Sequence, residues 1–281
     1  MTARAYAKIN FGLHIRGKRA DGYHELETVF LRVNINDTIS FAPCNSLQFS
    51  CSDPDLAAAD SNLCLKAARL LLSEANVTQG VEIRLQKSIP IGAGLGGGSS
   101  DAAATLVGLN DFLALRLPKE LLTDLAAQLG SDIPFFTQAS PAAYATGRGE
   151  LLSPLELSLP FSIVIVYPDV QISTSWAYSR LQLTKHTEEK NLREIVLEAI
   201  GQPPFKRSEI RNDFEPLVFS HYPQVSAVHD TLRRSGAVFA QLSGSGSAVY
   251  GLFEKEPRGV AEQFPLHYRI FITPPHFAPE T

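Results

Sequence analysis

The residues most able to do chemistry lie in one glycine-rich stretch, IPIGAGLGGGSSDAA, at positions 89–103. Glycine inside an ordered chain costs about 0.5–1 kcal/mol relative to alanine, so this density indicates a backbone that must approach another group closely. A strand is predicted before the glycines and a helix at Ser99 and Ser100, which directs backbone N–H groups and a positive helix end toward one point. Such a point binds anions, and the two serine hydroxyls can bond phosphate oxygens or a magnesium ion.

Other interpretations of the glycines remain open. A Walker A loop requires a lysine, and GAGLGGGSS contains none. The dinucleotide pattern G-x-G-x-x-G matches at Gly92, Gly94 and Gly97, but the chain stays helical where a second strand and an acidic residue should follow. A glycine turn with a serine N-cap and no ligand is the structural alternative. Asp101 is either a partner of the helix dipole, which we favour, or a magnesium contact.

Two charged residues elsewhere can complete a phosphate-transfer site. Transfer to an alcohol needs the phosphates held, the charge on the moving group neutralised, and an acceptor for the hydroxyl proton. Lys8 offers the cation and Asp132 offers the carboxylate. Each residue could equally have a structural role, because lysine is common on a solvated strand face and an aspartate before Pro134 suits a helix N-cap.

Strands and helices are predicted to interleave around these residues, which indicates an α/β or α+β class. Apolar residues alternate from Ala5 to Ile15, so this strand should bury one face and carry Lys8 and Asn10 side by side on its polar face. Further strands are predicted over residues 27–43, 80–90, 142–155 and 161–168, and a hairpin over residues 237–253. Helices are predicted over residues 61–77, 99–115 and 118–130, with two more within residues 208–236.

Composition narrows the class of protein. The chain has 281 residues, a net charge of −4 and no long cluster of lysine or arginine, so neither nucleic acid nor an anionic membrane is expected as a partner. Cys44, Cys51 and Cys64 lack zinc or CxxC spacing, which favours reduced thiols and a cytoplasmic location. No run approaches the ~20 apolar residues that cross a bilayer, and the N-terminus does not resemble a signal peptide.

The stretch PIGAGLGGGSSDAA resembles the phosphate loop of the GHMP kinases, whose usual form is P-x-x-x-G-L-G-S-S-A-A. The resemblance extends from Lys8 to Tyr250 and implies an α+β fold of two domains. Residues 1–155 would form an ATP-binding, ribosomal-S5-domain-2-like α/β domain, and residues 156–281 a ferredoxin-like domain. The implied ATP-binding residues are Pro90, Ile91, Gly92, Ala93, Gly94, Leu95, Gly96, Gly97, Gly98, Ser99 and Ser100. AYAKINFGLHI and QLGSDIPFF match the segments that carry the catalytic lysine and general base, so Lys8 and Asp132 take these roles.

The segment RADGYHELET, residues 19–28, is the most specific motif for one branch of the family. The residues alone indicate an Asp-Gly turn before a strand, but a flat tyrosine face and histidine ring nitrogens also suit a planar nucleobase. The branch phosphorylates the 2-hydroxyl of 4-diphosphocytidyl-2-C-methyl-D-erythritol in isoprenoid precursor synthesis. The resemblance therefore implies that Tyr23 and His24 bind cytosine and that Asn10 also contacts substrate. A second stacking wall is left open between Ile172, Trp176 and Tyr178.

Other segments agree with the family but assign less. QLSGSGSAVYGLF resembles its third motif and would place Gly244, Ser245 and Gly246 near phosphates or substrate, although the residues alone indicate only a hairpin turn. ATGRGE and NDFEPLV match the branch without an assigned chemistry. ATP with Mg²⁺ is the expected cofactor, without defined metal ligands, and the expected state is a monomer or weak dimer.

Two rival functions are weighed against this hypothesis. The first is phosphorylation of another small molecule by a GHMP kinase, which the Tyr23–His24 segment disfavours because acceptors such as mevalonate contain no base. The second is a non-catalytic nucleotide sensor on the same fold, which the presence of Lys8 and Asp132 disfavours.

Overall fold

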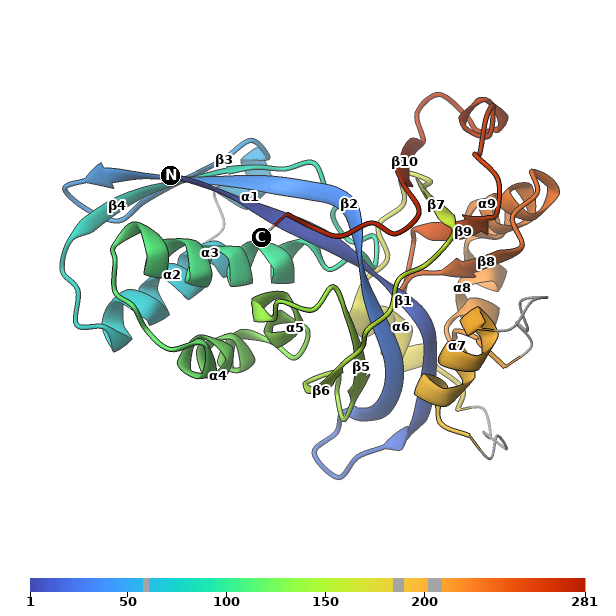
Figure 1. Ribbon diagram of the computed structural model, residues 1–281, viewed down its shortest axis with the longest axis horizontal. Helices are drawn as coiled ribbons and strands as arrows, with labels where there is room; N and C mark the ends of the chain where they lie inside the picture. Colours follow the sequence, from blue (N-terminus) through green and yellow to red (C-terminus); the bar gives the residue numbers. More distant parts are fainter. Residues whose placement is uncertain (58–60, 184–189, 202–208, 281) are drawn as a thin grey trace. The chain divides into compact units, whose positions relative to one another are not determined.

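The computed structural model describes residues 1–57, 61–183, 190–201 and 209–280, which divide into two compact units (Figure 1). The first unit comprises Met1–Ala7, Ile35–Pro90 and Gly96–Ala139, and the second comprises Lys8–Asn34, Ile91–Leu95 and Ser140–Thr281. Strands β1 (Thr2–Lys18) and β2 (His24–Cys44) contribute residues to both units. Each unit combines helices with a sheet, which confirms the predicted α+β class.

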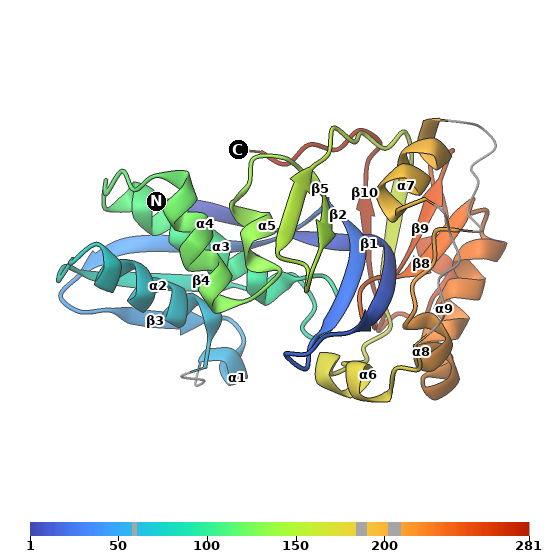
Figure 2. The same cartoon turned by 90° about the horizontal axis from the view of Figure 1, so that it is seen from below.

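The first unit packs helices against one face of a sheet. Strand β3 (Gln48–Cys51) runs parallel to β4 (Gly80–Gln86), and β4 pairs antiparallel with β2, with Thr38 opposite Gln86. Its helices are α1 (Pro54–Ala57), α2 (Leu63–Glu74), α3 (Gly97–Phe112), α4 (Lys119–Leu129) and α5 (Ile133–Thr137). Figures 1 and 2 show α2, α3 and α4 on the same face of these strands, and the core between them is apolar.

Local signals in the sequence account for the helix ends in this unit. Asn62 caps α2 by accepting a hydrogen bond from the backbone N–H of Cys64 at 2.8 Å. Helix α4 begins after Pro118 and ends at Gly130, as the sequence predicts. Helix α3 begins at Gly97, two residues before the predicted start, because Gly96 adopts φ +71° and turns the chain into the helix.

The second unit contains two groups of strands. Strand β2 pairs antiparallel with β5 (Ala142–Thr146), with Thr28 opposite Ala145, and β5 pairs with β6 (Leu151–Pro154). A further antiparallel sheet has the order β10-β7-β9-β8. These strands are β7 (Ser162–Tyr167), β8 (Phe239–Leu242), β9 (Val249–Phe253) and β10 (Arg269–Thr273). The predicted strand at 161–168 and the predicted hairpin at 237–253 are confirmed.

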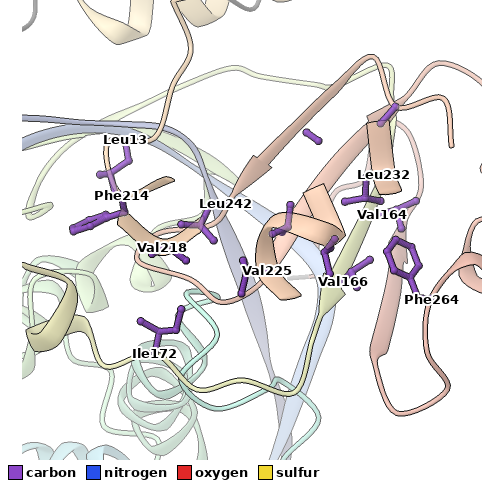
Figure 3. Close-up of a cluster of buried hydrophobic side chains, with 14 of the residues drawn as sticks. Leu13, Val164, Val166, Ile172, Phe214, Val218, Val225, Leu232, Leu242 and Phe264 are labelled. Carbon is purple, nitrogen blue, oxygen red and sulfur yellow. The ribbon is translucent and has the colours of Figure 1, made fainter. Parts of the chain in front are cut away.

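The described helices of the second unit are α6 (Thr174–Arg180), α7 (Leu192–Gly201), α8 (Glu215–His221), α9 (Pro223–Arg234) and the 3₁₀ helix η1 (Ala261–Gln263). Of these, α6, α8 and α9 bury apolar residues in one core with this sheet. Figure 3 shows Val218 of α8 and Val225 of α9 gathered in one core with Val164, Val166 and Leu242 of the strands. Helices α8 and α9 were predicted, whereas α6 and α7 were not.

Strand β1 differs from its prediction. Every residue from Ala5 to Ile15 is buried, so the expectation of one buried face and one solvated face is wrong. The second face can also be buried because polar side chains on it form hydrogen bonds within the protein, as Lys8 and Asn10 do. Across the described ranges, the helices are too short or too polar to cross a membrane.

Candidate functional site

Lys8 lies at the centre of a buried polar network in the second unit. It is 4% exposed, its ammonium donates to Asn10 Oδ1 at 2.5 Å, and Nζ lies 5.0 Å from the centroid of the Phe30 ring. Asn10 Nδ2 donates to Thr28 Oγ1 at 2.9 Å, and Thr28 donates to the Gly12 carbonyl at 2.6 Å. The ammonium is thereby held in one position by partners that are themselves fixed, and its burial strengthens its electrostatic interactions because the interior has a low dielectric constant.

The glycine loop meets this network through its residues 92–95. The backbone N–H of Lys8 donates to the Leu95 carbonyl at 2.9 Å, and Ala248 donates to the Ala93 carbonyl at 3.0 Å. Gly94 has φ +75°, and a Cβ atom there would lie 2.0 Å from the Ser243 carbonyl oxygen. Only glycine therefore allows this part of the loop to approach the turn after β8.

Ser243 joins the loop to β1. Its hydroxyl donates to the Gly94 carbonyl at 2.9 Å and accepts the N–H of Asn10 at 3.3 Å. A Cβ atom at Gly244 would lie 3.2 Å from Asn10 Oδ1, so the turn follows β1 closely. The structure thus brings together predicted residues from three distant motifs, namely Lys8, Asn10, Gly94 and Gly244, and adds Ser243.

The segment NDFE, residues 212–215, forms hydrogen bonds with the turn after β8 and with β1. The amide of Asn212, 2% exposed, donates to the carbonyls of Leu242 at 2.9 Å and Gly244 at 2.8 Å. Glu215 Oε1 accepts the N–H of Leu242 at 2.9 Å, and burial raises the pKa of this carboxyl to about 7 against that hydrogen bond. Asp213 accepts the N–H of Ile15 at 2.7 Å and so fixes β1 as well.

The end of the loop opens helix α3 in the first unit. No side chain caps this helix, because Gly96 occupies the N-cap position, and Gly98 is exposed. The hydroxyl of Ser100 is buried and donates to the Tyr6 carbonyl at 2.7 Å, whereas Ser99 remains half-buried. A helix N-terminus without a side-chain cap leaves backbone N–H groups and positive dipole for an anion, so this end fits phosphate oxygens.

Asp101 of α3 belongs to a buried charge cluster, not to the helix N-terminus. Lys87 donates to Asp101 Oδ2 at 2.7 Å and to Asp37, and Asp37 Oδ1 accepts the N–H groups of Ser88 and Ile89, the latter at 2.8 Å. Burial, together with the charge of Asp37, raises the pKa of Asp101 to about 8 against the attraction of Lys87. The favoured role of Asp101 as a helix-dipole partner is therefore wrong, because α3 begins early enough to put it in the second turn.

Asp132 directly precedes α5 in the first unit. It occupies the N-cap position with φ −84° and ψ −15°, but its side chain makes no capping hydrogen bond. The residue is half-buried. The structural alternative for this aspartate is therefore confirmed in position, because Asp132 is the N-cap residue of α5, although its side chain does not form the capping hydrogen bond.

The segment with Tyr23 and His24 lies at the start of β2 in the second unit. Tyr23 is 57% exposed, and burial followed by the charge of Lys18 lowers the pKa of His24, which keeps its ring neutral near pH 7. Of the three candidates for a second wall, Tyr178 lies beside His24, with ring centroids 5.1 Å apart. Trp176 instead packs edge-on to Tyr222 at 5.3 Å, and Ile172 is buried in the core.

Several site features carried no recognisable signal in the sequence. Ser243, Thr28, Asn212 and the Lys87 cluster act through partners far along the chain, so no local spacing indicates them. Within the residues that the structure describes, no three His, Cys, Asp or Glu side chains meet in a way that would hold a metal ion.

Comparison with known proteins agrees with this arrangement. Residues 62–140 match the GHMP kinases N terminal domain, and residues 189–270 match the GHMP kinases C terminal family. A curated 4-diphosphocytidyl-2-C-methyl-D-erythritol kinase of Prosthecochloris aestuarii is 48% identical over 99% of this chain and 98% of its own length. A kinase of the same name from Chlorobium phaeobacteroides is 47% identical over 99% of this chain and 98% of its own.

The chain belongs to the GHMP kinase family. Within the GHMP kinases it is similar to a crystal structure of 4-(cytidine 5'-diphospho)-2C-methyl-D-erythritol kinase, with a TM-score of 0.81, 35% identity, and coverage of 97% of this chain and 98% of the other. The mevalonate kinase of Methanococcus jannaschii shares the fold, with a TM-score of 0.65 and 18% identity over 98% of each chain. These matches confirm the predicted two-domain GHMP kinase fold.

Proposed function

We propose that this protein transfers the γ-phosphoryl group of ATP to the 2-hydroxyl of 4-diphosphocytidyl-2-C-methyl-D-erythritol, in isoprenoid precursor synthesis. The observation that carries the proposal is the near-full-length similarity to curated kinases of this name, at 48% and 47% identity. The buried Lys8 network and the uncapped start of α3 support a phosphate-transfer site in the same chain.

Lys8 and Asp132 are the proposed catalytic residues. As the acceptor oxygen attacks the γ-phosphorus, the bond to the bridging oxygen of ADP breaks and the hydroxyl proton passes to the carboxylate of Asp132. Lys8 would stabilise the negative charge that spreads over the transferring group, and its fixed position within the Asn10 network makes that stabilisation efficient.

The loop from Pro90 to Ser100 is the proposed site for the phosphates of ATP. Its support is the uncapped N-terminus of α3 and the run of glycines that leads into it, with positive φ angles at Gly92, Gly94 and Gly96. Glycine adds no side chain that could cover the backbone N–H groups. We propose that Mg²⁺ accompanies ATP and is held largely by phosphate oxygens, since Mg²⁺ in kinase sites commonly keeps few protein ligands.

Tyr23 and His24 are the proposed cytosine-binding residues, with Asn10 as a further substrate contact. The exposed ring of Tyr23 offers a stacking face, and the neutral ring of His24 offers one donor and one acceptor for the edge of a base. Tyr178 is the proposed second aromatic wall because, of the three candidates, its ring lies beside His24.

We propose an ATP-binding domain over residues 1–155 and a C-terminal domain over residues 156–281, acting in the cytoplasm as a monomer or weak dimer. We propose that the protein binds small molecules and that it binds neither nucleic acid nor a membrane. The three cysteines are free thiols, which suits a reducing compartment.

A coupled ADP-release assay tests the function. The wild-type protein should phosphorylate the cytidylated acceptor and act poorly on uncytidylated methylerythritol phosphate. Replacing Tyr23 or His24 with alanine should lower kcat/KM for the cytidylated acceptor by about ten- to a hundredfold, with little change in KM for ATP, since stacking of a base is worth about 1–3 kcal/mol. Equal activity of the wild-type protein on both acceptors would reduce the function to that of a general GHMP kinase.

A further inference from the structure

The loop ATGRGE is bound to the hairpin that carries Tyr23, although the sequence assigned it no chemistry. The backbone N–H of Leu26 donates to the Gly147 carbonyl at 2.8 Å, and the N–H of Gly147 donates to Glu25 Oε1 at 3.1 Å. These bonds come from β2 and from the turn after β5, within the second unit. They fix the loop against the residues that immediately follow Tyr23.

Arg148, the next residue of this loop after Gly147, lies over the Tyr23 ring. Its guanidinium carbon lies 4.8 Å from the ring centroid, a distance typical of a cation–π contact. Tyr23 nevertheless remains 57% exposed, so the contact leaves much of this residue accessible. An arginine suits this position because its planar, delocalised cation stacks on an aromatic ring in a way that lysine does not.

The guanidinium and the tyrosine backbone are each held from a second side. The N–H of Arg148 donates to Glu150 Oε2 at 2.6 Å, and Arg148 Nε lies 3.6 Å from Glu150 Oε1. Gly147 has φ +71°, and a Cβ atom there would lie 3.0 Å from the Glu150 carboxylate, so glycine lets that carboxylate approach. On the other side, the N–H of Tyr23 donates to Asp21 Oδ1 at 3.1 Å.

We infer that Arg148 is a positioning residue for the acceptor, which fixes the Tyr23 ring by one face so that the opposite face receives the cytosine. The inference rests on the proposed function. A ring that is already oriented loses less conformational freedom when a base stacks on it, so the gain appears as tighter acceptor binding. ATP binding should not depend on Arg148.

Steady-state kinetics of Arg148→Ala test this inference. We expect KM for the cytidylated acceptor to rise about two- to fivefold, which is the usual worth of an exposed cation–π contact, with kcat, KM for ATP and Tm unchanged. Arg148→Lys should recover only part of the loss. Arg258→Ala is the matched control, because Arg258 is exposed and also pairs with a glutamate two residues away, at 2.7 Å from Glu256.

A double-mutant cycle with Tyr23→Ala distinguishes positioning from direct contact. In the Tyr23→Ala background, Arg148→Ala should cause no further rise in KM, because the ring that it positions is gone. An equal rise in both backgrounds, or no rise in the wild-type background, would overturn the inference.

Calorimetric titration with cytidine monophosphate separates this inference from the function itself. Arg148→Ala should weaken the binding of cytidine monophosphate two- to fivefold in the wild-type background and not in the Tyr23→Ala background. If this result is found but the cytidylated acceptor is not phosphorylated, the inference stands and only the proposed function fails. If the wild-type protein phosphorylates the acceptor but Arg148→Ala leaves the Kd for cytidine monophosphate unchanged, the function stands and the inference fails. Failure of the wild-type protein to bind cytidine monophosphate at millimolar concentration would also overturn it.

Discussion

Replacing Asp101 with asparagine should change how the stability of the first unit depends on pH. Asp101 is 3% exposed and shares Lys87 with a second buried carboxylate, Asp37. One ammonium cannot neutralise two carboxylates in a buried site, so the structure favours a protonated Asp101. Among the described residues, none forms a hydrogen bond with its Oδ1 atom, and an ionised carboxylate would be most costly there.

The sign and size of the effect follow from the raised pKa. Burial raises the pKa of Asp101 to about 8 in the folded protein, from an ordinary value of 3.8 that applies in the unfolded chain. Its favourable contribution is therefore fully present below about pH 4 and is lost as the pH rises toward 8. The slope is about 1.4 kcal/mol per pH unit, so between pH 5 and 7.5 the loss is on the order of 3 kcal/mol. Asparagine stays neutral in both states and removes this slope.

Urea unfolding at pH 5, 6 and 7.5 measures the difference between Asp101→Asn and the wild-type protein. The difference in the free energy of unfolding, variant minus wild type, should become more positive by about 3 kcal/mol between pH 5 and pH 7.5. The contributions of other titrating groups cancel in this difference. Hydrogen exchange of the α3 amides assigns the transition to the first unit. Asp111→Asn, on an exposed site of the same helix, is the control. Parallel stability curves for the wild-type protein and Asp101→Asn would refute the reasoning.

Three further predictions concern the site. Asp132→Asn should lower kcat by about 10²- to 10⁴-fold while the Kd values for ATP and acceptor change less than about tenfold; near-normal kcat would remove Asp132 from the mechanism. Gly94→Ala should raise KM for ATP at least about tenfold, because the added Cβ would lie 2.0 Å from the Ser243 carbonyl oxygen and the loop would have to move. The control for stability is Gly98→Ala, which should unfold like the wild-type protein because the nearest atom to its Cβ lies at 3.6 Å. Asn212→Leu should lower the free energy of unfolding by about 2–6 kcal/mol in a urea titration, because two buried carbonyls lose their donor; a loss below about 1 kcal/mol would show that they find other partners.

Elements with strong local signals could be predicted from the sequence. Helices α2 and α4 carry an N-cap or proline at one end and an apolar stripe within, and both form where expected. The glycine loop was recognisable because so many glycines in succession are tolerated only where the backbone must come close to another group. Helix α7 is absent from the sequence-based prediction, although Leu192, Ile195, Val196 and Ala199 give it a regular apolar face that can indicate a helix.

Features that depend on distant pairing could not be predicted. Alternation along β1 correctly gave a strand, but whether its second face meets solvent or protein depends on residues far along the chain. Asp101 looked like a dipole partner because nothing nearby reveals that Lys87, 14 residues earlier, turns toward it. Asn212 and Ser243 likewise bond to groups that only the folded chain brings near.

The position of β1 among its partners has a consequence for the order of events during protein synthesis. Gly12 donates to Gln241 and Ile15 donates to Asp213, across 229 and 198 residues respectively. A ribosome adds about 5–20 residues per second, so β1 is made roughly 10–45 s before these partners are made. The first unit can close once residue 139 is made, but the segment from Lys8 to Asn34 must wait for almost the whole chain. The growing polypeptide therefore carries the apolar strand β1, which can already pair with β2, without its C-terminal partners through most of translation. We expect β1 to be open to mispairing during that interval and to be a place where a chaperone can bind.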